Sequence, residues 1–126
     1  MNPLRQWHRF VKTANPALLD EILSDEAAFH SPVVWTPQQG RSLTKTYLTA
    51  AAHIFKKGGF EYSKEIVNGN MACLEFNTRI DHITINGVDI ITWNDEGKIT
   101  EFKVMVRPIK AINILWEKMA AMLNKS

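Results

Sequence analysis

The stretch from Asn86 to Pro108, which reads NGVDIITWNDEGKITEFKVMVRP, constrains the fold of this chain more than any other. It contains two runs rich in β-branched and aromatic residues, Val88 to Trp93 and Ile99 to Val106. The residues between them, Asn94 to Gly97, are types that favour turns. We therefore predict a hairpin of two long strands.

Asp89 is the residue of this hairpin that most needs an explanation. Alternation along a strand puts Asp89 on the same face as Ile91 and Trp93, and the other face is also mostly apolar. We expect the strand to be covered on both faces, where ionisation of an unpaired acid is costly. Asp89 is then either a largely protonated acid that donates to a ligand oxygen in a cavity, or a structural acid paired with a backbone N–H or a base.

Composition excludes several classes of protein. A chain of 126 residues, 45% of them hydrophobic, predicts one domain over residues 1–126. The net charge of +2, with no basic cluster, argues against a nucleic-acid partner, and the apolar runs are too short for a membrane span. The N-terminus resembles a helix start rather than a signal peptide, and the lone Cys73 suits a reducing compartment, so we expect a cytoplasmic location.

The order of predicted elements indicates an α+β fold. Two short helices, which start at Asn2-Pro3 and Asn15-Pro16, precede the sheet. The remaining predicted elements are a strand over 27–34 interrupted at Pro32, a helix over 42–57, strands over 60–67 and 71–80, the central hairpin and a last helix from Pro108. Residues 81–87 are read as either a loop or the lead-in to the Asp89 strand. We expect the helices to pack on one face of a curved antiparallel sheet.

Two segments resemble a known family. FHSPVVWTPQQGRSL has a proline after the first strand and Gly40-Arg41 before the long helix, and VDIITWNDEGKITEFKVMV has a turn followed by Gly97-Lys98-Ile99. On these segments and the two N-terminal helices, nearly the whole chain resembles the nuclear transport factor 2-like (NTF2-like, cystatin-like) cone proteins of the SnoaL-like group. The resemblance implies a sheet with a hollow wide end. The fold hosts isomerases, dehydratases, cyclases, transport adaptors and binding modules.

The ketosteroid isomerases of that family match in part. Their strand acid, a neutral hydrogen-bond donor, falls on Asp89. Their first-helix tyrosine falls on Trp7, and their general base, just before the strand proline, falls on Ser31. Trp7 can donate an N–H, but Ser31 cannot take a proton unaided. The resemblance therefore argues against steroid isomerisation by that mechanism.

We expect a mostly apolar pocket for a small organic molecule, without cofactor or metal. Asp89 is the candidate acid, and His30 is either a general base near neutral pH or a histidine at the rim of the core. The residues expected to bind the ligand, or else to form an ordinary core, are Trp7, Ser31, Trp35, Tyr47, Phe55, Phe76, Thr78, Ile91, Phe102 and Val104. The other histidines are scattered, without the helical spacing of a zinc site.

The outward face of the sheet is expected to carry Glu75, Lys103 and Arg107. The resemblance implies that this face packs against a second subunit in a homodimer, and the alternative is a solvated charged face. The last helix could cover the sheet edge, reach the partner or cover the cavity. Two functions stay open: a cofactor-independent isomerase, dehydratase or cyclase that uses Asp89, and a non-catalytic binding or interaction module. A nuclear transport role rests on the fold alone.

Overall fold

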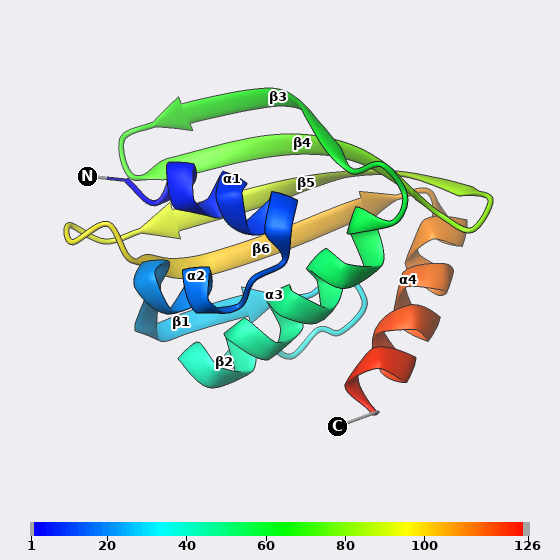
Figure 1. Ribbon diagram of the computed structural model, residues 1–126, viewed down its shortest axis with the longest axis horizontal. Helices are drawn as coiled ribbons and strands as arrows, with labels where there is room; N and C mark the ends of the chain where they lie inside the picture. Colours follow the sequence, from blue (N-terminus) through cyan, green and yellow to red (C-terminus); the bar gives the residue numbers. More distant parts are fainter. Residues whose placement is uncertain (1, 125–126) are drawn as a thin grey trace.

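The computed structural model describes residues 2–124 (Figure 1). The elements follow in the order α1 (Leu4–Thr13), α2 (Ala17–Ile22), β1 (Leu23–His30), β2 (Gln38–Gln39), α3 (Arg41–Lys56), β3 (Glu61–Asn68), β4 (Met71–Ile80), β5 (Ile83–Trp93), β6 (Ile99–Arg107) and α4 (Ile109–Leu123). The predicted α+β class, with helices before a meander of strands and one helix after it, is confirmed.

The six strands form one curved, open sheet in the order β2-β1-β6-β5-β4-β3. Strands β3 to β6 form an antiparallel meander, with Leu74 and Val104 on either side of Asp89. One pair departs from the expected antiparallel pattern, because β1 runs parallel to β6. These two strands are not consecutive in the chain, so no hairpin forces them to be antiparallel.

The first strand and the Asp89 strand both begin earlier than the sequence predicted. β1 starts at Leu23 and ends at His30, and its pairing with β6 has an irregular register between Leu23 and Ala28. β5 starts at Ile83 after a two-residue turn at Asp81 and His82, so residues 81–87 are mostly strand. The long β5–β6 hairpin predicted between 86 and 108 is confirmed.

The first helix forms where its start signal and apolar stripe predict it. The Asn2 side-chain oxygen accepts a hydrogen bond from the Leu4 backbone N–H at 3.1 Å. Its buried stripe consists of Leu4, Trp7 and Phe10, which face the sheet. Figure 1 shows this helix lying over the sheet. The Trp7 ring packs against the Phe102 ring of β6.

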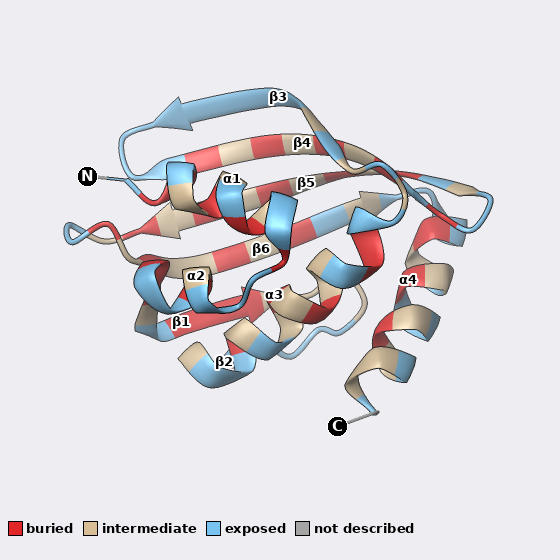
Figure 2. Cartoon of the chain, viewed as in Figure 1, coloured by how far each residue is buried: buried red, intermediate tan, exposed pale blue. Residues whose placement is uncertain are grey.

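The core lies between the sheet and the helices α1, α2, α3 and α4, and buried residues alternate with less buried ones along β4 and β5 (Figure 2). The opposite face of the sheet carries no helix within residues 2–124, and Val88, Ile90 and Thr92 there are half-buried. The expectation of a strand covered on both faces is therefore not met within this chain. None of the described helices is long and apolar enough to cross a membrane.

Candidate functional site

The Asp89 carboxyl lies on the inner face of the central hairpin. Its strand, β5, is bordered by β4 and β6, and alternation turns Asp89 inward with Ile91 and Trp93. The residue is 5% exposed. Asp89 is thus an acid held in the hydrophobic core by two neighbouring strands, as the sequence pattern predicted.

Two side chains from distant parts of the chain meet at this carboxyl. The Tyr62 hydroxyl, on β3, donates to Asp89 Oδ2 at 2.5 Å, and it accepts from Trp7 Nε1 at 2.9 Å. Among residues 2–124, Tyr62 supplies the one hydrogen bond to the Asp89 carboxyl. No described side chain donates a hydrogen bond to the other carboxyl oxygen, Oδ1.

Burial controls the protonation of both groups. Desolvation raises the pKa of Asp89 from its ordinary value of 3.8 to about 7, against the opposing effect of the Tyr62 hydrogen bond, which lowers it. The pKa of Tyr62 is also raised well above its usual value, by burial first and then by the Asp89 charge. The proton of the pair therefore stays on the phenol, and Asp89 is the group that titrates near neutral pH.

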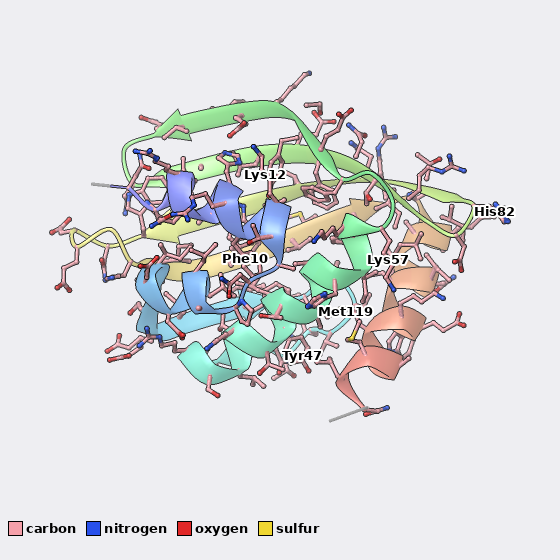
Figure 3. The ribbon with its side chains drawn as sticks, in the orientation of Figure 1. Phe10, Lys12, Tyr47, Lys57, His82 and Met119 are labelled. Atoms are coloured by element: carbon pink, nitrogen blue, oxygen red, sulfur yellow. The ribbon has the colours of Figure 1, made fainter. Side chains whose placement is uncertain are left out.

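A small apolar cavity adjoins Asp89 between α1, α3 and the sheet. Its volume is about 40 Å³. The residues that line it are Trp7, Phe10, Val11, Phe29, Leu48, Ala51, Ala52, Phe55, Phe60, Asp89, Phe102 and Val104. The first helix supplies Phe10, whose ring lies between this helix and the sheet in Figure 3. Asp89 is the one ionisable side chain in this lining.

Several of the residues expected to bind a ligand do lie around this cavity. Trp7, Phe55, Phe102 and Val104 line it directly, and the Trp7 and Phe102 rings are 4.6 Å apart between centroids. A second group packs in the surrounding core without lining the cavity, namely Tyr47, Phe76, Thr78 and Ile91. Thr78 uses its hydroxyl to bond the Phe55 carbonyl at 3.0 Å, which is a structural contact.

Three predicted site residues lie elsewhere. His30 is on the opposite face of the sheet, where its Nε2 lies 3.2 Å from Glu101 Oε2. Ser31 begins the loop after β1, and its hydroxyl accepts from the Val33 backbone N–H at 3.2 Å. Trp35 is 97% exposed. Strand alternation explains the outward position of His30, because the neighbouring Phe29 takes the inward position. Ser31 and Trp35 lie in the segment that follows β1 and do not line the cavity.

Tyr62 is the site residue that the sequence analysis missed. Its signal was present, because Phe60 and Tyr62 alternate with the polar Glu61 and Ser63 in a segment predicted to be a strand. Tyr62 pairs with the buried Phe76 of β4, just before the register of β3 shifts. The alternation and this pairing together turn its hydroxyl toward Asp89.

The described residues offer no evident metal site. Within residues 2–124, no three histidine, cysteine, aspartate or glutamate side chains lie close enough together to hold an ion. The ionisable group that lines the cavity is therefore the Asp89 carboxyl, which is bonded to the Tyr62 phenol and through it to the Trp7 indole N–H.

Comparison with known proteins identifies the family. A model described as "SnoaL-like domain" matches residues 4–102. The chain belongs to the SnoaL-like domain family. This confirms the resemblance drawn from the sequence. No match is found among the curated proteins.

Solved structures agree with this family assignment. The chain is 29% identical to a steroid delta-isomerase from Pseudomonas aeruginosa, with a TM-score of 0.92 over 98% of this chain and 90% of that one. It is 26% identical to an uncharacterised cystatin-like protein from Silicibacter pomeroyi (TM-score 0.88, 94% and 83% covered). An NTF2-like protein of unknown function from Mesorhizobium loti shares the fold at 21% identity (TM-score 0.73, 84% and 88% covered).

Proposed function

We propose that this SnoaL-like domain binds a small, mostly apolar organic molecule whose carbonyl, enol or phenol oxygen meets Asp89. The observation that carries the proposal is the Asp89 carboxyl, which is buried at the wall of an aromatic cavity with one oxygen bonded to Tyr62 and the other left for a ligand. An apolar cavity with few polar groups is the usual form of a small-molecule site.

The pKa of Asp89 fits it for proton transfer. A carboxyl with a pKa of about 7 is present in both protonated and ionised forms at neutral pH, so it can donate to a ligand oxygen or accept a proton from it. Donation to an oxygen that gains negative charge is the chemistry of isomerases, dehydratases and cyclases that act through an enol. The likeness to a steroid delta-isomerase supports this class.

The size of the cavity limits the ligand. A volume of about 40 Å³ is far below the roughly 300–1,000 Å³ of common ligand pockets. Val11, Ala51, Ala52 and Phe60 are half-buried and form its rim, whereas Trp7 and Phe102 are buried. The ligand therefore enters between α1 and α3 by displacing the rim side chains, with its oxygen toward Asp89.

A non-catalytic binding module is the second candidate. It is favoured by the single ionisable group in the cavity lining and by the absence of Ser31 and His30 from that lining. Enzymes that move a proton between carbon atoms need a base, and Asp89 would have to serve as both base and donor. The two candidates differ in whether a bound ketone exchanges its α-hydrogens.

The test compares ligands that differ in one oxygen. We expect 2-naphthol to bind the wild-type protein more tightly than naphthalene, with shifts in the NMR signals of the Trp7 indole and of Asp89. Asp89→Leu should remove the preference, since the hydrogen bond to the hydroxyl is lost. Asp25→Leu, which changes an aspartate whose side chain is 91% exposed, is the matched control. Equal binding of both ligands by the wild-type protein would contradict the proposal.

Catalysis is tested with a bound cyclic ketone in heavy water. Exchange of the α-hydrogens for deuterium, faster in the wild-type protein than in Asp89→Asn, would support the enzyme. Binding without accelerated exchange would support the binding module.

We also propose a homodimer through the outward face of the sheet. Arg107 Nε donates to Asn86 Oδ1 at 2.9 Å, and Asn86 Nδ2 donates to Glu75 Oε2 at 2.9 Å, so the charged groups of this face are held in place. Met105 is 49% exposed beside them, and Lys103 lies on the same strand. An ordered polar network around exposed apolar side chains resembles an interface more than a solvated surface.

Sedimentation at micromolar concentration tests the dimer. We expect the wild-type protein to sediment as a dimer and Met105→Glu as a monomer, whereas Lys12→Glu on the helical side should stay dimeric. A wild-type monomer would contradict the proposal.

The lone Cys73 fits a reducing compartment, and we propose a cytoplasmic location on that ground.

A further inference from the structure

A large groove lies at the far end of the molecule from the turn between β5 and β6. It is formed where α3 ends, where β4 turns into β5 and where the last part of α4 passes, and its volume is about 810 Å³. We propose that this groove binds an amphiphilic organic anion, with a carboxylate or phosphate at its cationic rim and a short apolar chain along its wall. The proposal is independent of the Asp89 cavity.

The groove has the size that the Asp89 cavity lacks. A volume of about 810 Å³ lies within the roughly 300–1,000 Å³ of small-molecule pockets, compared with about 40 Å³ beside Asp89. Within the residues that the structure describes, the groove is therefore much larger than the cavity beside Asp89. A ligand can therefore enter it without displacing core side chains.

The wall of the groove is apolar and its rim is basic. Ile54 and Ile80, both buried, form the wall with Ala121 and Met122 of α4. The basic residues that line the groove come from separate segments: Lys57 after α3, Arg79 and His82 around the β4–β5 turn, and Lys118 on α4. Figure 3 shows Lys57 at the end of α3 and His82 at the tip of the β4–β5 turn.

The charge balance of the lining favours an anion. The lining contains three permanent cations and one acid, Asp81, whose Oδ2 lies 3.5 Å from Lys118 Nζ. Within residues 2–124, Lys57 and Arg79 take part in no ion pair. The C-terminal end of α3 adds a partial negative charge of about half a unit, which is smaller than the two uncompensated positive charges.

The segments that carry Lys57 and Arg79 are in direct contact. A Cβ atom added to Gly58 would lie 1.8 Å from the carbonyl oxygen of Arg79, so the end of α3 rests directly on the backbone of β4. Lys57 and Arg79 are therefore anchored on segments in direct contact. The Asp81–Lys118 pair ties the β4–β5 turn to α4 in the same way. This site is formed before any ligand arrives, which lowers the entropic cost of binding.

Octanoate, 1-octanol and inorganic phosphate are suitable probes. We expect octanoate to bind the wild-type protein and to shift the backbone NMR signals of Lys57, Gly58 and Arg79. The double variant Lys57→Gln/Arg79→Gln should bind it about tenfold more weakly, and Lys12→Gln, which removes a cation from α1, should bind it normally. Octyl phosphate in place of octanoate distinguishes a phosphate head group from a carboxylate.

Each other outcome overturns the proposal. Equal binding of 1-octanol would show that the charge is not recognised, and equal binding of inorganic phosphate would show that the apolar wall is not used. Octanoate shifts at Trp7 and Tyr62, with none at Lys57, would place the ligand in the other cavity. Asp89→Asn should leave octanoate binding unchanged, so failure at one site is distinguishable from failure at the other.

Discussion

Two aspartates of this sheet, Asp89 inside β5 and Asp81 in the turn between β4 and β5, have different surroundings. Asp89 is 5% exposed, and its one hydrogen-bond partner in the described chain is the Tyr62 phenol. The Asp81 side chain is 59% exposed and lies 3.5 Å from the Lys118 ammonium. Burial raises the pKa of Asp89 to about 7, whereas Asp81 lines an open groove and its side chain is mostly exposed to solvent. The comparison teaches that solvent access, more than residue type, decides what a carboxyl can do.

The two regions should also select ligands by different means. A dry cavity recognises a ligand through one hydrogen bond, because an unmade bond there is costly. An open basic groove recognises charge, and salt weakens that attraction over a Debye length of about 8 Å at physiological ionic strength. Substitutions in the two regions should therefore differ in the size of their effects and in how those effects depend on pH and salt.

The largest expected effect is on the pH dependence of stability. The folded-state pKa of Asp89 is above its unfolded value, so the folded protein binds more protons and loses stability as pH rises from about 4 through about 7. The full loss is up to about 4 kcal/mol, and Asp89→Asn should remove it. Urea unfolding across this pH range measures the difference.

Asp81→Asn is the matched control for that experiment, because it removes an exposed carboxyl of the same type. If Asp81→Asn flattened the pH dependence as much as Asp89→Asn does, the contrast between the buried and the exposed aspartate would be wrong.

Two glycines allow the packing beside the groove to be compared with the packing near Asp89. Gly58→Ala should cost about 3 kcal/mol or more, because its Cβ would lie 1.8 Å from a backbone oxygen that cannot rotate away. Gly87→Ala, near Asp89, should cost about 1–3 kcal/mol, because its nearest contact, Phe76 Cζ at 2.3 Å, is a side-chain atom and its backbone contact, the Met105 carbonyl oxygen, is less close at 2.8 Å. Thermal unfolding of both variants tests the order, and a larger loss for Gly87→Ala would contradict it.

Tyr62→Phe should have a smaller effect that depends on pH. The Tyr62 hydrogen bond lowers the pKa of Asp89, so its removal should raise that pKa further. The cost in stability should be about 1 kcal/mol where Asp89 is protonated and about 2 kcal/mol where it is ionised. Carboxyl ¹³C NMR titration measures the pKa, and Tyr47→Phe, on α3, is the control. A lower pKa of Asp89 in Tyr62→Phe would contradict the conclusion that the Tyr62 hydrogen bond lowers that pKa.

The smallest expected effect is at the exposed pair in the groove. Lys118→Gln should cost less than about 1 kcal/mol, because both partners remain hydrated. High salt should remove most of that difference. Urea unfolding at low and high salt checks this, and a larger or salt-independent loss would mean that the groove is less open than the structure indicates.

Local patterns in the sequence determined most of the architecture. The period-two alternation around Asp89 placed its carboxyl inward, and the turn at 94–97 defined the hairpin. The start signal at Asn2-Pro3 placed α1, and the helix predicted over 42–57 matches α3 at Arg41–Lys56. Such signals are predictable because they repeat within a few residues along one element.

The tertiary structure decided what surrounds Asp89. Its partner Tyr62 is 27 residues away, and the Tyr62 partner Trp7 is 55 residues away, so their meeting depends on the order and register of the strands. The exposed Trp35, the outward His30 and the parallel pairing of β1 with β6 also follow from that arrangement. Alternation along a strand fixes the face on which a side chain lies, whereas the neighbours it meets there are set by contacts between distant segments.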